Sequence, residues 1–92
     1  MFVHIVWYDL RDGNWEIYYK RSIDGGLNWG AETRLTNNAA FSQLPSVSVS
    51  GQIVSVLWQD ERDGNSEIYY KRSTDEGVSW GADTRLTNNP AP

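Results

Sequence analysis

The 92-residue chain contains no cysteine, a single methionine and a single histidine, His4. Without cysteine there is no disulfide framework and no thiolate metal site, and one histidine does not supply the ligand set of a zinc site. Runs of lysine or arginine are also missing, and twelve acidic residues against eight basic ones give a net charge of -4. Because binding to nucleic acids and acidic membranes depends on clustered positive charge, the sequence predicts neither partner.

Long apolar runs are absent too, so we expect no segment that spans a bilayer. The N-terminus lacks the charged and apolar regions of a signal peptide, and the residues alone indicate no compartment. What the chain does contain is five tryptophans, five tyrosines and two phenylalanines beside eight glycines. Aromatic residues favour strands and glycines favour tight turns, so the composition predicts a small all-β protein with one core.

The sequence repeats itself with a period of 51 residues. Residues 2–41 and 53–92 align without a gap and are identical at 26 of 40 positions. A period of about 40 to 50 residues with strand-like content is typical of a propeller blade, a unit that stacks on copies of itself to bury its faces. We therefore predict a single unit, residues 1–92, with repeat 1 at residues 2–41 and repeat 2 at residues 42–92.

Period-two alternation and Gly-containing turns predict seven antiparallel strands. We expect them at residues 2–8, 15–22, 28–36, 43–50, 53–60, 66–73 and 79–87. Asp-Gly pairs at residues 12–13 and 63–64 are typical of hairpin turns. The predicted fold is two four-stranded propeller blades, of which the first lacks the innermost strand that residues 43–50 supply to the second.

Two segments share the pattern S-x-D-x-G-x-x-W between the second and third predicted strands of each repeat. The pattern residues are Ser22, Asp24, Gly26 and Trp29 in repeat 1 and Ser73, Asp75, Gly77 and Trp80 in repeat 2. Their aspartates can accept hydrogen bonds from the turn, their glycines can take a positive φ, and their tryptophans can cover the hairpin end. The segments resemble the Asp-box of the bacterial neuraminidase repeat, and the resemblance extends over nearly the whole chain. It implies a sialidase-like propeller, a structural role for the box, and a secreted or cell-surface parent protein.

The same resemblance raises the question of sialidase activity. That family grips the substrate carboxylate with three arginines, one of them in a motif of the form F/Y-R-I/L-P. Here the corresponding residues read Ser42-Gln43-Leu44-Pro45, with Gln43 in the arginine's place. A neutral amide cannot replace a bidentate guanidinium, so we predict no enzyme activity and no catalytic residue.

Polar and aromatic residues cluster in the loops that a propeller would bring to one face. This candidate ligand face comprises Asp9, Arg11, Asp12, Asn14, Trp15, Asn37, Asn38 and Gln43, with Asp60, Arg62, Asp63 and Asn65 as repeat counterparts. Loops on a rigid scaffold often carry function, and this mixture of residues suits sugars. Two interpretations stay open, a hairpin stabilised by pairing of Asp9 with Arg11, and a site for a glycan or another small polar ligand.

Metal binding has one candidate in the sequence. Asp9, Asp12 and Asn14 bring hard oxygens to short spacing, as calcium requires. The run is shorter than an EF-hand loop and lacks its closing glutamate. We therefore predict no metal and no cofactor, with calcium as the alternative.

Two blades cannot close a ring and would leave apolar faces and strand edges in water. We predict that the chain assembles with itself, three chains giving a six-bladed ring or four chains an eight-bladed one. The homotrimer is the first choice, with the second blade of one chain packed on the first blade of the next. The predicted function is a non-catalytic module with lectin-like binding of glycans as its most concrete form. The alternative is a segment, natural or engineered, of a longer sialidase-like array with no activity of its own.

Overall fold

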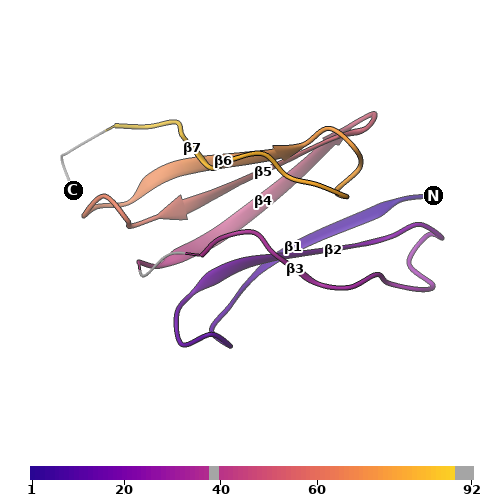
Figure 1. Cartoon of the computed structure of the whole chain (residues 1–92), viewed down its shortest axis with the longest axis horizontal. Helices are drawn as coiled ribbons and strands as arrows, with labels where there is room; N and C mark the ends of the chain where they lie inside the picture. The colour runs from indigo at the N-terminus through magenta and orange to yellow at the C-terminus, as the bar shows by residue number, and fades with distance from the viewer. Residues whose placement is uncertain (38–39, 89–92) are drawn as a thin grey trace.

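Seven β-strands make up the chain in its computed structural model, which describes residues 1–37 and 40–88. The strands are β1 (Val3–Asp9), β2 (Glu16–Ser22), β3 (Thr33–Arg34), β4 (Ser42–Ser50), β5 (Ile53–Asp60), β6 (Glu67–Ser73) and β7 (Thr84–Arg85). They form two antiparallel sheets, one of order β1-β2-β3 and one of order β4-β5-β6-β7 (Figure 1). The described residues contain no helix, and the predicted all-β fold is confirmed.

Glycines in the left-handed region form the hairpin turns at the predicted places. Gly13 has a φ of 83° and its N–H donates to the Leu10 carbonyl at 3.0 Å. Gly64 has a φ of 94° and its N–H donates to the Glu61 carbonyl at 3.1 Å. A side chain would strain either position, which explains why glycine follows aspartate in both turns.

The predicted strands at 28–36 and 79–87 are wrong in their length, because β3 and β7 contain two residues each. The turn before β3 continues to residue 28, where the Asp24 carboxylate accepts the backbone N–H of Asn28 at 2.9 Å. After it, the chain follows β2 through two backbone hydrogen bonds outside the regular ladder. Gly30 donates to the Arg21 carbonyl at 2.9 Å and Leu35 donates to the Ile17 carbonyl at 2.8 Å.

β4 begins with an irregularity in its pairing with β5. The register shifts between Gln43 and Ser46, and Leu44 has a φ of 55°. Pro45 lies inside this stretch, where its missing N–H breaks the ladder without disrupting the regular pairing that follows. The outer edge of β4 carries no hydrogen-bonded strand in the described chain.

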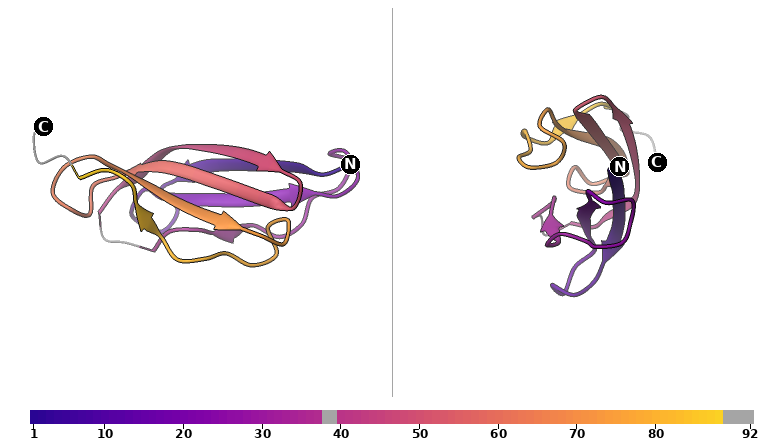
Figure 2. Two further views of the ribbon diagram at one scale, coloured as in Figure 1. Left: turned by 90° about the horizontal axis from the view of Figure 1, so that it is seen from above. Right: turned by 90° about the vertical axis from the view of Figure 1, so that its right-hand side faces the viewer.

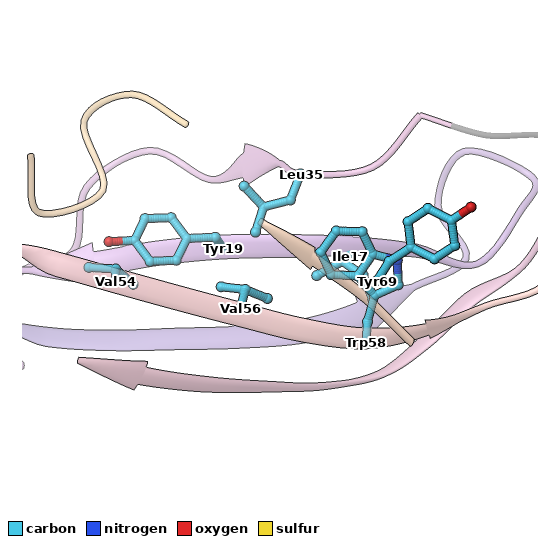
Figure 3. Close-up of a cluster of buried hydrophobic side chains, with 7 residues drawn as sticks. All are labelled: Ile17, Tyr19, Leu35, Val54, Val56, Trp58 and Tyr69. Carbon is cyan, nitrogen blue, oxygen red and sulfur yellow. The ribbon is translucent and has the colours of Figure 1, made fainter. Parts of the chain in front are cut away.

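The two sheets share one hydrophobic core (Figure 3). The first sheet and the segment after it contribute Ile17, Tyr19 and Leu35, and the second sheet contributes Val54, Val56, Trp58 and Tyr69. Viewed end-on, the strands follow an open arc in which β1 lies beside β4 (Figure 2). Among the described residues the arc does not close into a barrel, because β3 and β7 at its two ends are not hydrogen-bonded to each other, and neither are β1 and β4.

Each repeat presents two different faces, which we name after characteristic residues. The leucine face is Val6, Ile17, Tyr19 and Leu35 in repeat 1 and Leu57, Ile68, Tyr70 and Leu86 in repeat 2. The tryptophan face is Val3, Ile5, Trp7 and Tyr18 in repeat 1 and Val54, Val56, Trp58 and Tyr69 in repeat 2. The core joins the leucine face of repeat 1 to the tryptophan face of repeat 2. The repeats therefore meet through opposite faces.

Candidate functional site

The turns between β1 and β2 and between β5 and β6 lie at one end of the molecule (Figure 1). The segment that leads into β4 lies at the same end, where Ser42 donates its backbone N–H to the Trp15 carbonyl at 2.8 Å. The Asn14 side chain donates to the Ala40 carbonyl at 2.9 Å. Hairpin and segment are thus joined, and residues of the predicted ligand face come together at this end.

In repeat 1, the centre of this end is the pair of Asp9 and Arg11. An Arg11 nitrogen lies 2.8 Å from the Asp9 carboxylate, and another lies 2.6 Å from Glu32. The guanidinium also lies over the Tyr18 ring, 4.2 Å from its centroid. Hydrogen bonds from the Arg11 side chain and backbone lower the pKa of Asp9 to about 2. The predicted pairing of Asp9 with Arg11 is present.

Repeat 2 builds the same arrangement with its counterparts. Arg62 bonds Asp60 and Asp83 at 2.8 and 2.9 Å and lies 4.1 Å from the Tyr69 ring centroid. Asp60 is fully buried, and it also accepts the Trp58 indole N–H at 2.9 Å. Burial raises the pKa of Asp60, but the hydrogen bonds from Arg62 and Trp58 outweigh burial and leave the pKa below its usual value.

The second aspartate of each turn binds a tyrosine. Tyr18 donates its hydroxyl to Asp12, and Tyr69 donates to Asp63 at 2.6 Å. The Asp12 hydrogen bond raises the pKa of Tyr18, whereas burial followed by the Asp63 hydrogen bond raises the pKa of Tyr69 to about 12. Both hydroxyls therefore stay protonated near neutral pH.

Buried glutamates follow each turn. Glu16 is fully buried and accepts the Thr36 hydroxyl at 2.5 Å and an Arg34 nitrogen at 3.1 Å. Asn14 donates its side-chain N–H to the same carboxylate at 3.1 Å. The counterpart set has the same geometry, with Glu67 accepting from Thr87, Arg85 and Asn65. Such pairing is what permits a carboxylate to be buried.

Trp15 and Gln43 occupy the margin of this end. The Trp15 ring lies 5.1 Å from the Tyr8 ring, tilted by 58°, and Gln43 pairs with Gln59 across the sheet. Asn37 is exposed, and Asn38 lies outside the described residues.

The chemistry of this end is dominated by groups that satisfy each other. The arginines bind the aspartates, the tyrosines bind the remaining carboxylates, and the asparagines bind the glutamates. Within residues 1–37 and 40–88, no group of three or more histidine, aspartate or glutamate side chains is arranged to hold a metal ion. Binding of a glycan to this end stays a prediction.

The two S-x-D-x-G-x-x-W segments form nearly identical turns at the opposite end. In the first, the Ser22 hydroxyl donates to Asp24 at 2.7 Å and accepts the Gly26 N–H at 2.8 Å. Ser73 makes the equivalent bonds with Asp75 and Gly77 at 2.6 and 2.8 Å. Hydrogen bonds lower the pKa of each aspartate to about 2, mainly from Asn28 to Asp24 and from Ser73 and Ser79 to Asp75.

One of these turns also takes part in the contact between the repeats. The Trp80 ring meets the Tyr19 ring edge-on at 4.9 Å between centroids, whereas Trp29 is 40% exposed. The Glu76 carbonyl accepts hydrogen bonds from Arg21 at 2.7 Å and from Tyr19 at 3.5 Å. Tyr19 in turn bonds His4 Nδ1 at 2.7 Å.

The sequence interpretation did not single out this group of His4, Tyr19 and Glu76. His4 is a half-buried residue of β1. The one available signal was a mismatch between the repeats, because His4 aligns with Ser55 and Glu76 aligns with Gly25. The mismatch marks positions where the two copies have different neighbours.

Comparison with protein-family models, with curated proteins and with solved structures finds no match for this chain. In the part of the chain that the structure describes, there is no helix of the length and apolarity needed to cross a membrane.

Proposed function

We propose that this chain is a non-catalytic β-propeller module that assembles with copies of itself into a closed ring, three chains being the first choice and four the alternative. The observation that carries the proposal is the contact between the repeats. The leucine face of repeat 1 packs on the tryptophan face of repeat 2. The leucine face of repeat 2 and the tryptophan face of repeat 1 take no part in this contact within the described chain. Because they are equivalent to its two halves, repeat 2 of one chain can pack on repeat 1 of the next chain in the same way.

The exposure of matched residues supports a second use of these faces. Leu35 is 4% exposed within the core, whereas its counterpart Leu86 is 52% exposed. Val56 is fully buried, whereas its counterpart Ile5 is 42% exposed. A contact between two different faces is heterologous, and repeating it closes a ring when the rotation permits. Burial of such apolar surface is the main favourable term in association.

Hydrogen bonds between the repeats also have counterparts at the two unused faces. Lys71 donates to the Leu35 carbonyl at 2.7 Å, and Arg21 donates to the Glu76 carbonyl at 2.7 Å. In a contact between chains, the counterparts are Lys20 with the Leu86 carbonyl, and Arg72 with the Gly25 carbonyl. Arg72 is exposed in the single chain and free to reach a neighbour.

The non-catalytic part of the proposal draws on Gln43 and on the state of the tyrosines. Gln43 stands where the resemblance would require a substrate-binding arginine. The family that the sequence resembles uses a tyrosine as its nucleophile, and the raised pKa values of Tyr18 and Tyr69 disfavour the phenolate form. A fluorogenic sialoside assay should stay at background, and hydrolysis that depends on either tyrosine would contradict this part.

Charged substitutions on the two faces test the assembly. Ile5→Asp and Leu86→Asp each place a carboxylate in the middle of an interface that only the assembled form buries. Sedimentation velocity should show both variants as folded monomers. Leu27→Asp is the matched control, because Leu27 is 83% exposed and its counterpart Val78 stays 68% exposed even beside the neighbouring repeat. Assembly of all three variants alike would overturn the proposal.

Mixing the two face variants separates a heterologous contact from a symmetric one. The Ile5→Asp chain keeps an intact leucine face on repeat 2, and the Leu86→Asp chain keeps an intact tryptophan face on repeat 1. An equimolar mixture should therefore form a one-to-one dimer that grows no further. A mixture that stays monomeric, while the unmodified chain assembles, would show that other surfaces drive assembly.

A further inference from the structure

The outer edge of β1 carries no hydrogen-bonded strand among the described residues. Its counterpart in repeat 2, β5, is paired on that side with β4. We infer that the outer edge of β1 is a strand-acceptor site, which takes an extended segment with the sequence pattern of β4 from another chain. This is β-augmentation, in which main-chain hydrogen bonds supply affinity and side-chain positions supply specificity. The site adjoins the tryptophan face of repeat 1, because Val3 and Ile5 belong to that face and also to the edge strand β1.

A cavity lies where one end of the added strand would pass, beside the first residues of β1. It has a volume of about 500 Å³ and lies between Val3 and His4 of β1 and Val47 and Val49 of β4. β4 is the strand that lies beside β1 in the arc of the molecule (Figure 2). An innermost strand of repeat 1 would run through this space, since it would pair with β1 and face β4.

The pairing of β4 with β5 in repeat 2 predicts the register in which an added strand would pair with β1. Across β4 and β5, Val49 lies opposite Val54, Val47 opposite Val56, and Ser42 opposite Asp60. Shifting by the period of the repeat places the same three residues of an incoming strand opposite Val3, Ile5 and Asp9. The two valines would then form cross-strand pairs with apolar side chains, Ile5 being 42% exposed without them.

A comparison of Asp9 with Asp60 shows what the added strand would contribute. Both aspartates accept bonds from an arginine two residues later and from a tryptophan two residues earlier. Of the two, only Asp60 has a further donor among the described residues, the Ser42 hydroxyl of β4 at 3.1 Å, and its side chain is fully buried. The Asp9 side chain is 25% exposed. An incoming serine in the same register would complete the set around Asp9.

His4 gives a second, independent indication. Its Nε2 atom is buried and has no hydrogen-bond partner within the described structure. In repeat 2 the equivalent position is Ser55, which lies opposite Ser48. The counterpart of Ser48 on an incoming strand would therefore lie opposite His4. A hydroxyl can donate or accept, so it can satisfy the Nε2 atom in either tautomer of the ring.

A synthetic peptide with the sequence of residues 41–52 tests the site directly. At a peptide concentration about ten times the dissociation constant, hydrogen exchange of backbone amides in residues 3–9 should slow by about tenfold, with residues 53–60 unchanged. No slowing at millimolar peptide would overturn the inference. Slowing at the β7 edge instead, or faster exchange in residues 42–50 from displacement of β4, would also contradict it.

N-methylated peptides distinguish strand pairing from apolar adhesion. Alternate N–H groups of a strand point to opposite edges, so methylation at Ser46 and Ser48 and methylation at Val47 and Val49 affect different edges. One of the two peptides should lose binding and the other should keep it. Equal binding by both would show that the backbone does not pair with β1.

Discussion

Gly77 lies directly against the phenol ring of Tyr19, 58 residues earlier in the chain. A Cβ atom at Gly77 would be 2.6 Å from the Tyr19 Cζ atom and closer still to the hydroxyl oxygen. Gly77 also has a φ of 89°. The glycine of the second S-x-D-x-G-x-x-W segment thus serves two purposes, because it forms its own turn and admits the aromatic ring of the other repeat.

We expect Gly77→Ala to destabilise the chain more than Gly26→Ala. Both substitutions place a side chain at positive φ, at a cost of about 1 kcal/mol. Gly26 has its nearest neighbour at 3.9 Å, so it has room for the methyl group. At Gly77 the clash with the buried Tyr19 ring should add about 1–3 kcal/mol. Urea unfolding of both variants measures the difference, and equal losses would contradict the close contact.

Acid should weaken the two S-x-D-x-G-x-x-W turns. The folded pKa of Asp24 and of Asp75 is about 2, below the usual 3.8. The stabilisation from these groups is therefore complete above pH 3.8 and is lost as the pH falls towards about 2. The double variant Asp24→Asn and Asp75→Asn should melt at a lower temperature near neutral pH and lose less on acidification. If the melting temperatures of the unmodified chain and the double variant fall by the same amount as the pH is lowered, the stabilisation by Asp24 and Asp75 is refuted.

Leu35→Ala should cost far more stability than Leu86→Ala in the monomer, although the two leucines occupy the same position in their repeats. Leu35 is buried between the sheets, and truncation of a buried leucine costs about 3 kcal/mol. Leu86 is 52% exposed, so its truncation should change the stability of a monomer by about 0.5 kcal/mol or less. Chemical unfolding in the Ile5→Asp background, which keeps the chain monomeric, makes the comparison. Similar losses would mean that the leucine faces are equivalent in the single chain.

His4 should make stability depend on pH just below neutrality. Burial lowers its pKa from 6.5, so the folded state favours the neutral ring. Stability should be complete above pH 6.5 and fall as the pH drops below it, because the unfolded chain then binds more protons. His4→Ser, which installs the residue of repeat 2, should flatten this slope. An unchanged slope in thermal melts would place the titrating group elsewhere.

Local patterns in the sequence are sufficient to predict five of the seven strands and both Asp-Gly turns. Alternation located β1, β2, β4, β5 and β6 to within about two residues, the usual uncertainty of strand ends. The Asp-Gly pairs located both hairpins. The lengths of β3 and β7 were missed because a side-chain bond from Asp24 to the backbone of Asn28 competes with strand pairing, and alternation does not register such a bond.

The choice of faces could not be predicted. β1 has apolar residues on both sides, with Ile5 and Trp7 on one and Val6 and Tyr8 on the other. The pattern is consistent with packing on either face, and only the arrangement of the two sheets decides between them. Contacts such as Tyr19 with Glu76 join residues far apart in sequence, where no periodicity applies. The described residues of the candidate ligand face bind one another, and this mutual pairing depends on side-chain geometry that no sequence pattern reveals.

Native mass spectrometry of the unmodified chain tests self-assembly most directly. If the faces at the two ends of the chain are halves of one contact, a single closed species of three chains should dominate, or of four chains if the ring holds eight blades. That species should be absent from the spectrum of the Ile5→Asp variant and present in the spectrum of the Leu27→Asp variant. A monomer at every concentration, or a continuous series of sizes, would contradict the formation of a closed ring.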